Sequence, residues 1–104
     1  MQERTHTCGE LTAKNLDEVV TLYGWIHTRR DHGGLIFIDL WDKYGLTQVV
    51  LNPQIDQLAH QEAHSLRGNF VISVRGKVRP RPEDMINPKL KTGEVEVFIE
   101  QLEI

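Results

Sequence analysis

Residues 35–41 alternate between two kinds of side chain, and this alternation constrains the fold more than any other feature. The even positions are aliphatic, whereas the odd positions run from Phe37 through an aspartate to Trp41. Because a β-strand points successive side chains to opposite faces, the aliphatic set predicts a core face. Phe37 and Trp41 are then expected on the solvent side of a small barrel, close to Arg29 and Arg30. Two exposed aromatics beside two arginines would form a platform on which an unpaired base can stack.

Similar patterns predict five strands, at residues 19–27, 35–41, 46–51, 70–78 and 94–99. Gly24 is expected where the first strand bends or accepts a close backbone contact. The second strand should follow a turn at residues 33–34. A short hairpin connection is expected at residues 42–45, with Gly45 free to take a positive φ. Residues 79–93 hold three of the four prolines and predict a long irregular loop.

Between the third and fourth strands, the pair Asn52 and Pro53 is typical of a helix start. Apolar residues recur at helical spacing as far as Gly68, which should end the helix. The predicted order is therefore three strands, one helix and two strands. This order is that of the OB-fold, an all-β, five-stranded Greek-key barrel with its helix between strands three and four. Pattern alone also permits another small barrel. At 104 residues, we expect a single domain, 1–104.

The overall charge argues against a general polyanion binder, because the formal net charge is -3. A nucleic-acid partner would therefore need a local basic patch. Residues 67–91 offer one, with seven of the 12 Lys and Arg residues: Arg67, Arg75, Lys77, Arg79, Arg81, Lys89 and Lys91.

The single cysteine, Cys8, excludes an intramolecular disulfide and suits a reducing compartment. The sequence contains no apolar run of membrane-spanning length, and residues 1–6 lack the apolar core of a signal peptide. We therefore predict a cytoplasmic protein without a membrane partner.

Each candidate binding residue has an ordinary alternative. Phe37 and Trp41 can stack on bases or pack under a neighbouring loop or domain. Gln48 and Glu96, which are expected to face outward, can read base edges or be ordinary surface groups. Asn87 can present its amide to a base or form a turn. The remaining candidates either contact phosphates or bases or belong to a solvated face: Arg29, Arg30, Arg79 and Arg81.

Enzyme signatures are absent from the sequence, which has no nucleophile elbow and no phosphate-binding loop. His60 and His64 stand one helical turn apart, a spacing that can hold a metal, but no third ligand is evident nearby. We therefore predict no metal site and no cofactor for this domain.

Three long segments, in order, carry a resemblance to a known family: RTHTCGEL at 4–11, GWIHTRRDHGGLIFIDLWDKYGLTQVV at 24–50, and GKVRPRPEDMINPKLKTGEVEV at 76–97. They resemble the N-terminal anticodon-binding domain of bacterial-type aspartyl-tRNA synthetases, the aspartate–tRNA ligases. The resemblance covers essentially the whole chain, and the fold it implies is again the OB barrel.

The resemblance implies a role for each matching residue at an anticodon of the GUC type. Phe37 matches the aromatic that stacks on the central base, and Gln48 matches the residue that reads that base. Asn87 matches a loop residue near the third base. Glu96 matches the acid that reads the first base, a guanine or its modified form.

Further matches concern the anticodon loop and the breadth of tRNA choice. Arg30 and Arg81 match arginines that contact the loop, and Arg29 and Arg79 are possible additional contacts. His32, in the turn RRDHGG, resembles the form of this turn in synthetases that charge both tRNA-Asp and tRNA-Asn. The resemblance therefore extends to recognition of GUU as well as GUC.

The sequence also departs from the family pattern. Thr28, Trp41 and Lys43 stand where arginine is usual, and residues 84–85 replace small or polar loop residues with Asp84 and Met85. These changes remove positive charge near the expected site. The resemblance supplies no role for Trp41.

This domain alone is not expected to catalyse a reaction. The resemblance implies a parent aspartate–tRNA ligase, a homodimer using ATP and Mg²⁺, whose class II catalytic domain is absent from the chain; we expect an excised or truncated domain. Two alternatives are a stand-alone OB-fold protein that binds single-stranded nucleic acid and a protein-interaction barrel.

Overall fold

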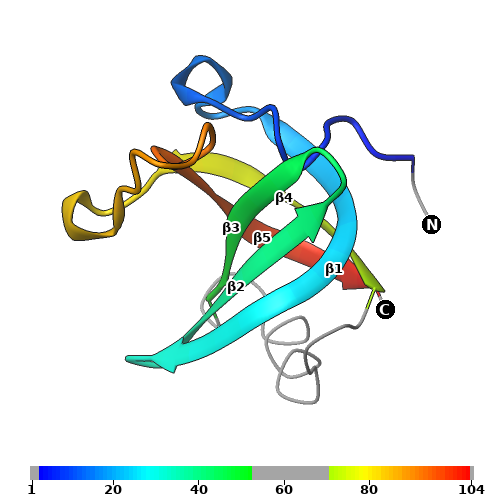
Figure 1. Cartoon of the computed structure of the whole chain (residues 1–104). Coiled ribbons are helices and arrows are strands. Elements are labelled where there is room, and N and C mark those ends of the chain that lie inside the picture. Colours follow the sequence, from blue (N-terminus) through cyan, green and yellow to red (C-terminus); the bar gives the residue numbers. More distant parts are fainter. Residues whose placement is uncertain (1–2, 53–70, 104) are drawn as a thin grey trace.

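The computed structural model describes residues 3–52 and 71–103, and within them the chain forms a closed five-stranded β-barrel (Figure 1). Around the barrel the strands follow the order β1-β2-β3-β5-β4. All neighbours are antiparallel except β3 and β5, which pair in parallel and close the barrel. The strands are β1 (Val19–His32), β2 (Leu35–Asp42), β3 (Gly45–Leu51), β4 (Val71–Pro80) and β5 (Val95–Glu103).

These bounds confirm the predicted barrel and its five strands. β1 continues five residues beyond the predicted end at residue 27, and β5 reaches residue 103 instead of 99. The predicted helix at 52–68, with His60 and His64, lies almost entirely outside the described residues, and so does Phe70. Within the described residues, no helix is long and apolar enough to cross a membrane.

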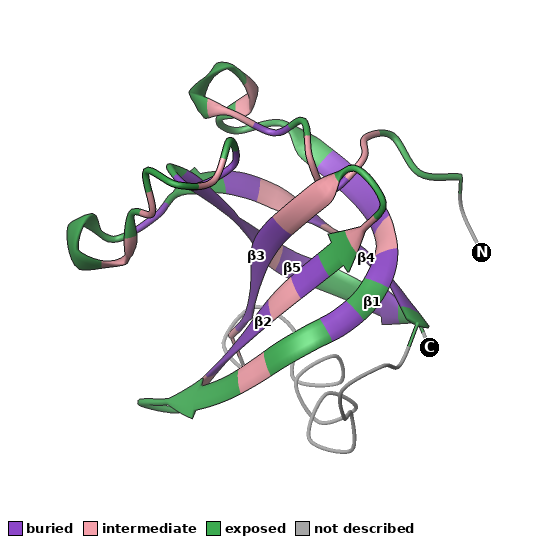
Figure 2. Ribbon diagram, in the orientation of Figure 1, coloured by how far each residue is buried: buried purple, intermediate pink, exposed green. Residues whose placement is uncertain are grey.

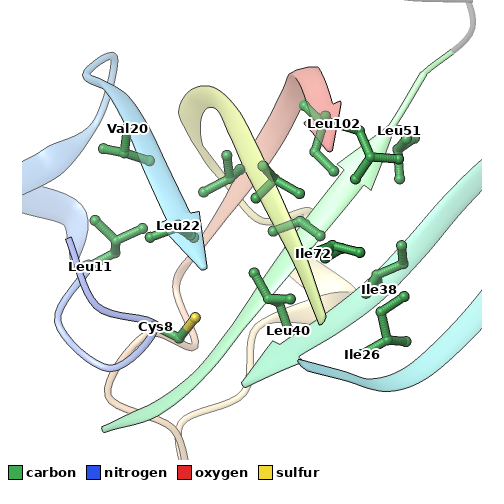
Figure 3. Close-up of a cluster of buried hydrophobic side chains, with 14 of the residues drawn as sticks. Cys8, Leu11, Val20, Leu22, Ile26, Ile38, Leu40, Leu51, Ile72 and Leu102 are labelled. Atoms are coloured by element: carbon green, nitrogen blue, oxygen red, sulfur yellow. The ribbon is translucent and has the colours of Figure 1, made fainter. Parts of the chain in front are cut away.

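One aliphatic cluster fills the barrel (Figure 3). The even positions of β2, together with Val95, Val97 and Ile99 of β5, are buried in it, as the alternation predicts. The N-terminal segment adds Cys8 and Leu11 to the same cluster. Burial raises the pKa of the Cys8 thiol, and the neighbouring Asp42 raises it further.

The N-terminal segment is tied to the hairpin between β2 and β3. The Cys8 N–H donates to the Asp42 carboxylate at 2.9 Å, and the Thr47 hydroxyl donates to the Cys8 carbonyl at 2.6 Å. Gly45 does not use its freedom to take a positive φ; among the glycines that the structure describes, only Gly33 and Gly34 do. Gly45 is instead needed for space, because a Cβ there would lie 2.6 Å from the Cα of Gly9.

Strand β1 belongs to both halves of the barrel. Residues 19–25 pair with β4, and residues 25–32 pair with β2. At the changeover, a Cβ on Gly24 would lie 2.5 Å from the Trp41 carbonyl oxygen. The close contact predicted for Gly24 is therefore confirmed.

A bulge just beyond this point reverses the side-chain alternation of β1. Ile26 pairs with Leu40, but Thr28 rather than His27 pairs with Asp39. The extra residue puts His27 and Thr28 on the outer face together and turns Arg30 outward. Without the bulge, the alternation set by Ile26 would point Arg30 toward the core side.

The predicted irregular loop begins after Pro80, where β4 ends. It contains one short 3-10 turn, η2 (Glu83–Met85). Backbone hydrogen bonds hold its base, from Arg81 N to Glu94 O at 2.9 Å and from Asn87 N to Gly93 O at 3.0 Å. The Thr92 hydroxyl also donates to the Leu46 carbonyl of β3. These bonds fix the loop against the barrel end.

Gly76 lies beside a second bulge, whose extra residue is in β5, and it generates a prediction about stability. A Cβ at Gly76 would lie 1.9 Å from the Phe98 carbonyl oxygen. Because backbone must move to admit it, we expect Gly76→Ala to lower the free energy of unfolding by about 3 kcal/mol or more. Gly34→Ala is the control, since Gly34 has φ +83 but open space around it, and should cost only about 1–2 kcal/mol. Equal losses in urea denaturation would contradict the steric argument.

Candidate nucleic-acid interface

The outer face of the barrel carries two neighbouring rows of side chains that cross all five strands. The paired residues of the first row are polar: Thr28, Asp39, Gln48, Glu96 and Arg79. The second row lies two residues further along each strand and is largely apolar at its centre: Arg30, Phe37, Val50, Phe98 and Lys77. The parallel pairing of β3 with β5 is what puts Gln48 beside Glu96.

Gln48 is the centre of a hydrogen-bonded network. Its amide nitrogen donates to Glu96 Oε1 at 2.7 Å. Its amide oxygen accepts from Arg30 Nη2 at 3.2 Å and from Arg81 Nη1 at 3.3 Å. Only 1% of Gln48 is exposed. The prediction of an outward-facing Gln48 is right about the face, but the amide is covered and makes three hydrogen bonds.

Arg81 anchors the loop to this network. Its Nε donates to the Val95 carbonyl at 3.0 Å, and its Nη1 also donates to the Met85 carbonyl at 3.2 Å. Burial lowers the pKa of Arg81, and the carboxylates of Asp39 and Glu96 work against that change. Its Nη2 is buried and has no hydrogen-bond partner. A buried donor without a partner is costly, so Arg81 offers a place for an incoming acceptor.

Glu96 is buried as well, with 3% of its surface exposed. The alternative of an ordinary solvated surface charge is therefore wrong. Burial raises the pKa of Glu96, against the opposing effects of the Gln48 hydrogen bond and the Arg81 charge. A carboxylate has about four acceptor sites. Glu96 can therefore accept from Gln48 and still accept from a ligand.

A groove of about 530 Å³ opens above this network, between the outer face and the loop. Its strand side carries donors and acceptors together, and its loop side contributes apolar surface. The lining residues are His27, Thr28, Arg30, Asp39, Leu46, Gln48, Arg81, Asp84, Met85, Ile86, Asn87 and Leu90. A flat apolar body with polar edges, such as a nucleobase, matches this lining.

The structure thus brings together five of the six residues assigned to the anticodon site. Arg30, Gln48, Arg81 and Asn87 line the groove, and Glu96 joins them through Gln48. Asn87 is also a turn residue, because its Oδ1 accepts from the Lys89 N–H at 3.0 Å.

Phe37, the sixth residue, lies in the second row between Arg30 and Val50. It is outside the aliphatic cluster, but only 7% of it is exposed. The prediction of two solvent-exposed aromatics is therefore right for Trp41, at 44%, and wrong for Phe37. Because cross-strand neighbours flank its ring closely, Phe37 contributes packing as well as any stacking surface.

The additional candidates are placed around the groove rather than in it. Arg29 pairs with Ile38, on the face opposite to Arg30, and its Nε lies 3.1 Å from Asp31 Oδ1. His32 is exposed at the end of β1, two residues beyond Arg30 on the same face. The Cζ of Arg79 lies 5.9 Å from the centre of the Phe98 ring.

Asp39 is a site residue to which the sequence analysis assigned no role. Its Oδ2 accepts from the Thr28 hydroxyl at 2.7 Å, and its Oδ1 lies 3.9 Å from Arg30 Nη2. The signal was present, since Asp39 shares the alternation of Phe37 and Trp41. Nothing in the sequence indicated that the backbone carbonyl of Met85 accepts a hydrogen bond from Arg81. In the described part of the chain, no group of three or more His, Cys, Asp or Glu side chains could hold a metal ion.

Comparison with known families assigns the fold to a class. The model of the tRNA anticodon type of OB-fold nucleic acid binding domain matches residues 20–104. The chain belongs to this family. The groove lies on the barrel face of an anticodon-type OB domain.

The curated relatives of this anticodon-type OB domain are similar over almost its whole length. An aspartate–tRNA(Asp/Asn) ligase from Oleidesulfovibrio alaskensis is 59% identical over 94% of the chain, and one from Salinibacter ruber is 56% identical over 97%. The chain spans only 16% of the length of each. Among solved structures, the asparaginyl-tRNA synthetase from Pyrococcus horikoshii in complex with asparaginyl-adenylate has a TM-score of 0.81 at 25% identity. That likeness covers 100% of this chain and 22% of the other.

The buried carboxylate generates a prediction about pH. The folded protein holds a proton on Glu96 more tightly than the unfolded chain does, because its folded pKa is raised above 4.5. Stability is then fully present below that value and falls as pH rises through the folded pKa. We expect the free energy of unfolding of the wild type, relative to Glu96→Gln, to fall as pH rises over the range above 4.5. Urea denaturation across that range measures it; a difference that rises with pH would show that the arginines dominate.

Proposed function

We propose that this chain is the anticodon-recognition module of an aspartate–tRNA ligase and that it reads the anticodons GUC and GUU. The groove carries this proposal, because it joins a buried carboxylate, an amide and two guanidinium groups on the outer face of an anticodon-type OB barrel. The names of the curated relatives, ligases for tRNA(Asp/Asn), support both anticodons.

In this proposal Glu96 selects the first base. An acid near RNA repels phosphate and is useful only as an acceptor of base N–H groups. Guanine presents two such donors side by side, N1–H and the exocyclic amine, whereas adenine lacks that pair. Adenine would leave the buried carboxylate partly unpaired, which is a mismatch that discriminates strongly.

Gln48 is proposed to read the central base. In the structure its amide oxygen accepts from both Arg30 and Arg81, and its nitrogen is held by Glu96. The amide nitrogen carries a second N–H that can donate to a base, whereas a base donor must replace or share one of the two arginine contacts of the amide oxygen. The network holds the amide in place beforehand, so little side-chain freedom is lost on binding.

The remaining assignments follow the groove. Phe37 is proposed to stack on the central base along the ring edge that remains accessible, and Asn87 to contact the third base. Arg30 and Arg81 would contact the anticodon loop. The unpartnered Nη2 of Arg81 would donate a hydrogen bond to a base or phosphate oxygen. These roles use every charged group of the network.

In this proposal, the rest of the parent protein carries out catalysis. We propose that a catalytic part outside this chain joins aspartate to tRNA with ATP and Mg²⁺, and that the parent is a cytoplasmic homodimer. The chain itself binds the anticodon loop and thereby places the tRNA. A general binder of single-stranded nucleic acid would be indifferent to the anticodon sequence, which separates the two functions.

The sharpest test of this function is the role of Glu96 in choosing guanine. Glu96→Gln keeps the shape and an acceptor for Gln48, but it removes the charge and puts a donor opposite a guanine donor. We expect the ratio of affinities for anticodon stem-loops beginning with G and with A to fall by about 5- to 150-fold, the equivalent of about 1–3 kcal/mol. Glu94→Gln, an exposed neighbour, is the matched control and should leave the ratio unchanged. An unchanged ratio in Glu96→Gln would move first-base reading elsewhere.

The breadth of tRNA choice is tested at His32. We expect the wild type to bind stem-loops with GUC and GUU with similar affinity, since His32 places a polar side chain on the same face as Arg30. His32→Leu should bind GUU less well relative to GUC. A wild-type preference for GUC of tenfold or more, about 1.4 kcal/mol, would contradict recognition of both anticodons. Fluorescence anisotropy at fixed salt measures both ratios.

A further inference from the structure

Two exposed tryptophans lie side by side on the barrel, beyond the end of the groove. Trp25 of β1 and Trp41 of β2 are directly paired, and 46% and 44% of them are exposed. Figure 2 shows exposed segments on both strands. The His27 ring lies 5.3 Å from the Trp41 ring, with the planes tilted by 46°. We call Trp25, His27 and Trp41 the aromatic shelf.

The shelf continues the groove. His27 lines the groove on one side and contacts Trp41 on the other. Trp41 in turn borders a surface hollow of about 500 Å³, lined by Trp25, Trp41, Asp42 and Lys43. His27 is the extra residue of the β1 bulge.

Charge on the rim of the shelf favours an anion. Lys43 lines the hollow, and a second hollow beside Trp25 includes Arg4. The one carboxylate of this rim, Asp42, accepts backbone N–H groups of Cys8, Tyr44 and Gly45 at 2.9, 2.8 and 3.1 Å. The negative charge of Asp42 is therefore already engaged by backbone N–H groups of the protein. The shelf offers ring faces and cations together, as single-stranded nucleic-acid sites do.

We propose that the aromatic shelf is a second stacking subsite, which takes an unpaired base of a nucleotide next to those in the groove. The proposal rests on the proposed function, because the RNA strand is assumed to enter the groove. A strand leaving the groove past His27 meets Trp41 first, and its phosphate lies within reach of Lys43. Base–aromatic stacking tolerates any base, so this subsite adds affinity without adding sequence choice.

The two tryptophans are the only ones in the chain, so intrinsic fluorescence reports the shelf directly. We would titrate the chain with the trinucleotide GUC and with a stem-loop whose seven-nucleotide loop contains it. Trp25→Phe leaves Trp41 as the single reporter. The stem-loop should quench Trp41 fluorescence, whereas the trinucleotide, confined to the groove, should not.

Affinity provides the second readout. Trp41→Thr, which keeps a strand-forming residue, should weaken stem-loop binding by about 5- to 150-fold and leave trinucleotide binding unchanged. Leu16→Thr is the control, since it removes an exposed apolar side chain that lines neither the groove nor the shelf hollows. Circular dichroism checks the fold. Should Trp41→Thr unfold, quenching in the Trp25→Phe variant by stem-loops with one abasic loop position at a time decides the question.

The outcomes separate the subsite from the function. Abasic substitution of one flanking nucleotide should remove both the quenching and the effect of Trp41→Thr. Equal stem-loop affinity for Trp41→Thr and wild type, with no quenching, overturns the subsite while the choice of G over A through Glu96 still stands. Quenching that occurs with the same affinity for any loop sequence supports the subsite and contradicts anticodon reading. If no RNA quenches the tryptophans, the subsite is wrong.

Discussion

The hydrogen bonds of one buried amide hold the functional face of this protein together. Gln48 donates to Glu96 across the parallel β3–β5 pair and accepts from Arg30 of β1 and Arg81 of the loop. A carboxylate and a guanidinium buried separately would each be destabilising. Placed around one amide, the two charges partly compensate each other. The hydrogen bonds of this amide also connect β1, β5 and the loop to β3. Removing the amide would leave both charges buried without their common partner.

Two backbone features make this network possible. The bulge in β1 turns Thr28 and Arg30 to the outer face, and the parallel pairing of β3 with β5 sets Gln48 beside Glu96. Neither feature adds a functional group. Each changes only the direction in which an existing side chain points. In this way a small barrel with an ordinary aliphatic core presents a continuous polar surface. The loop then completes the groove, because Arg81 binds it through the Val95 and Met85 carbonyls.

The proposed roles divide the outer face between specificity and affinity. In the groove, donors and acceptors have fixed positions, and only a base with matching edges satisfies them. On the aromatic shelf, ring faces are exposed and nothing selects one base over another. Trp41 stands at the border of these two regions, where the family pattern has an arginine. A neutral aromatic there exchanges a phosphate contact for a stacking surface, consistent with a chain whose net charge is negative.

The barrel could be predicted from the sequence. Side-chain alternation, turn residues and the order of the strands each depend on residues that are close together in the chain. The same local patterns placed Gln48 and Glu96 on the outer face, and family motifs named the residues that meet in the groove. Burial was decided only by the tertiary structure. Phe37, Gln48 and Glu96 face outward by alternation yet are buried, since rows from strands distant in sequence lie against them. The side on which Arg30 lies, the partners of Asp39 and the steric role of Gly45 also depended on contacts that no local pattern encodes. They arise from a bulge and from close backbone approaches, which exist only once the barrel has closed.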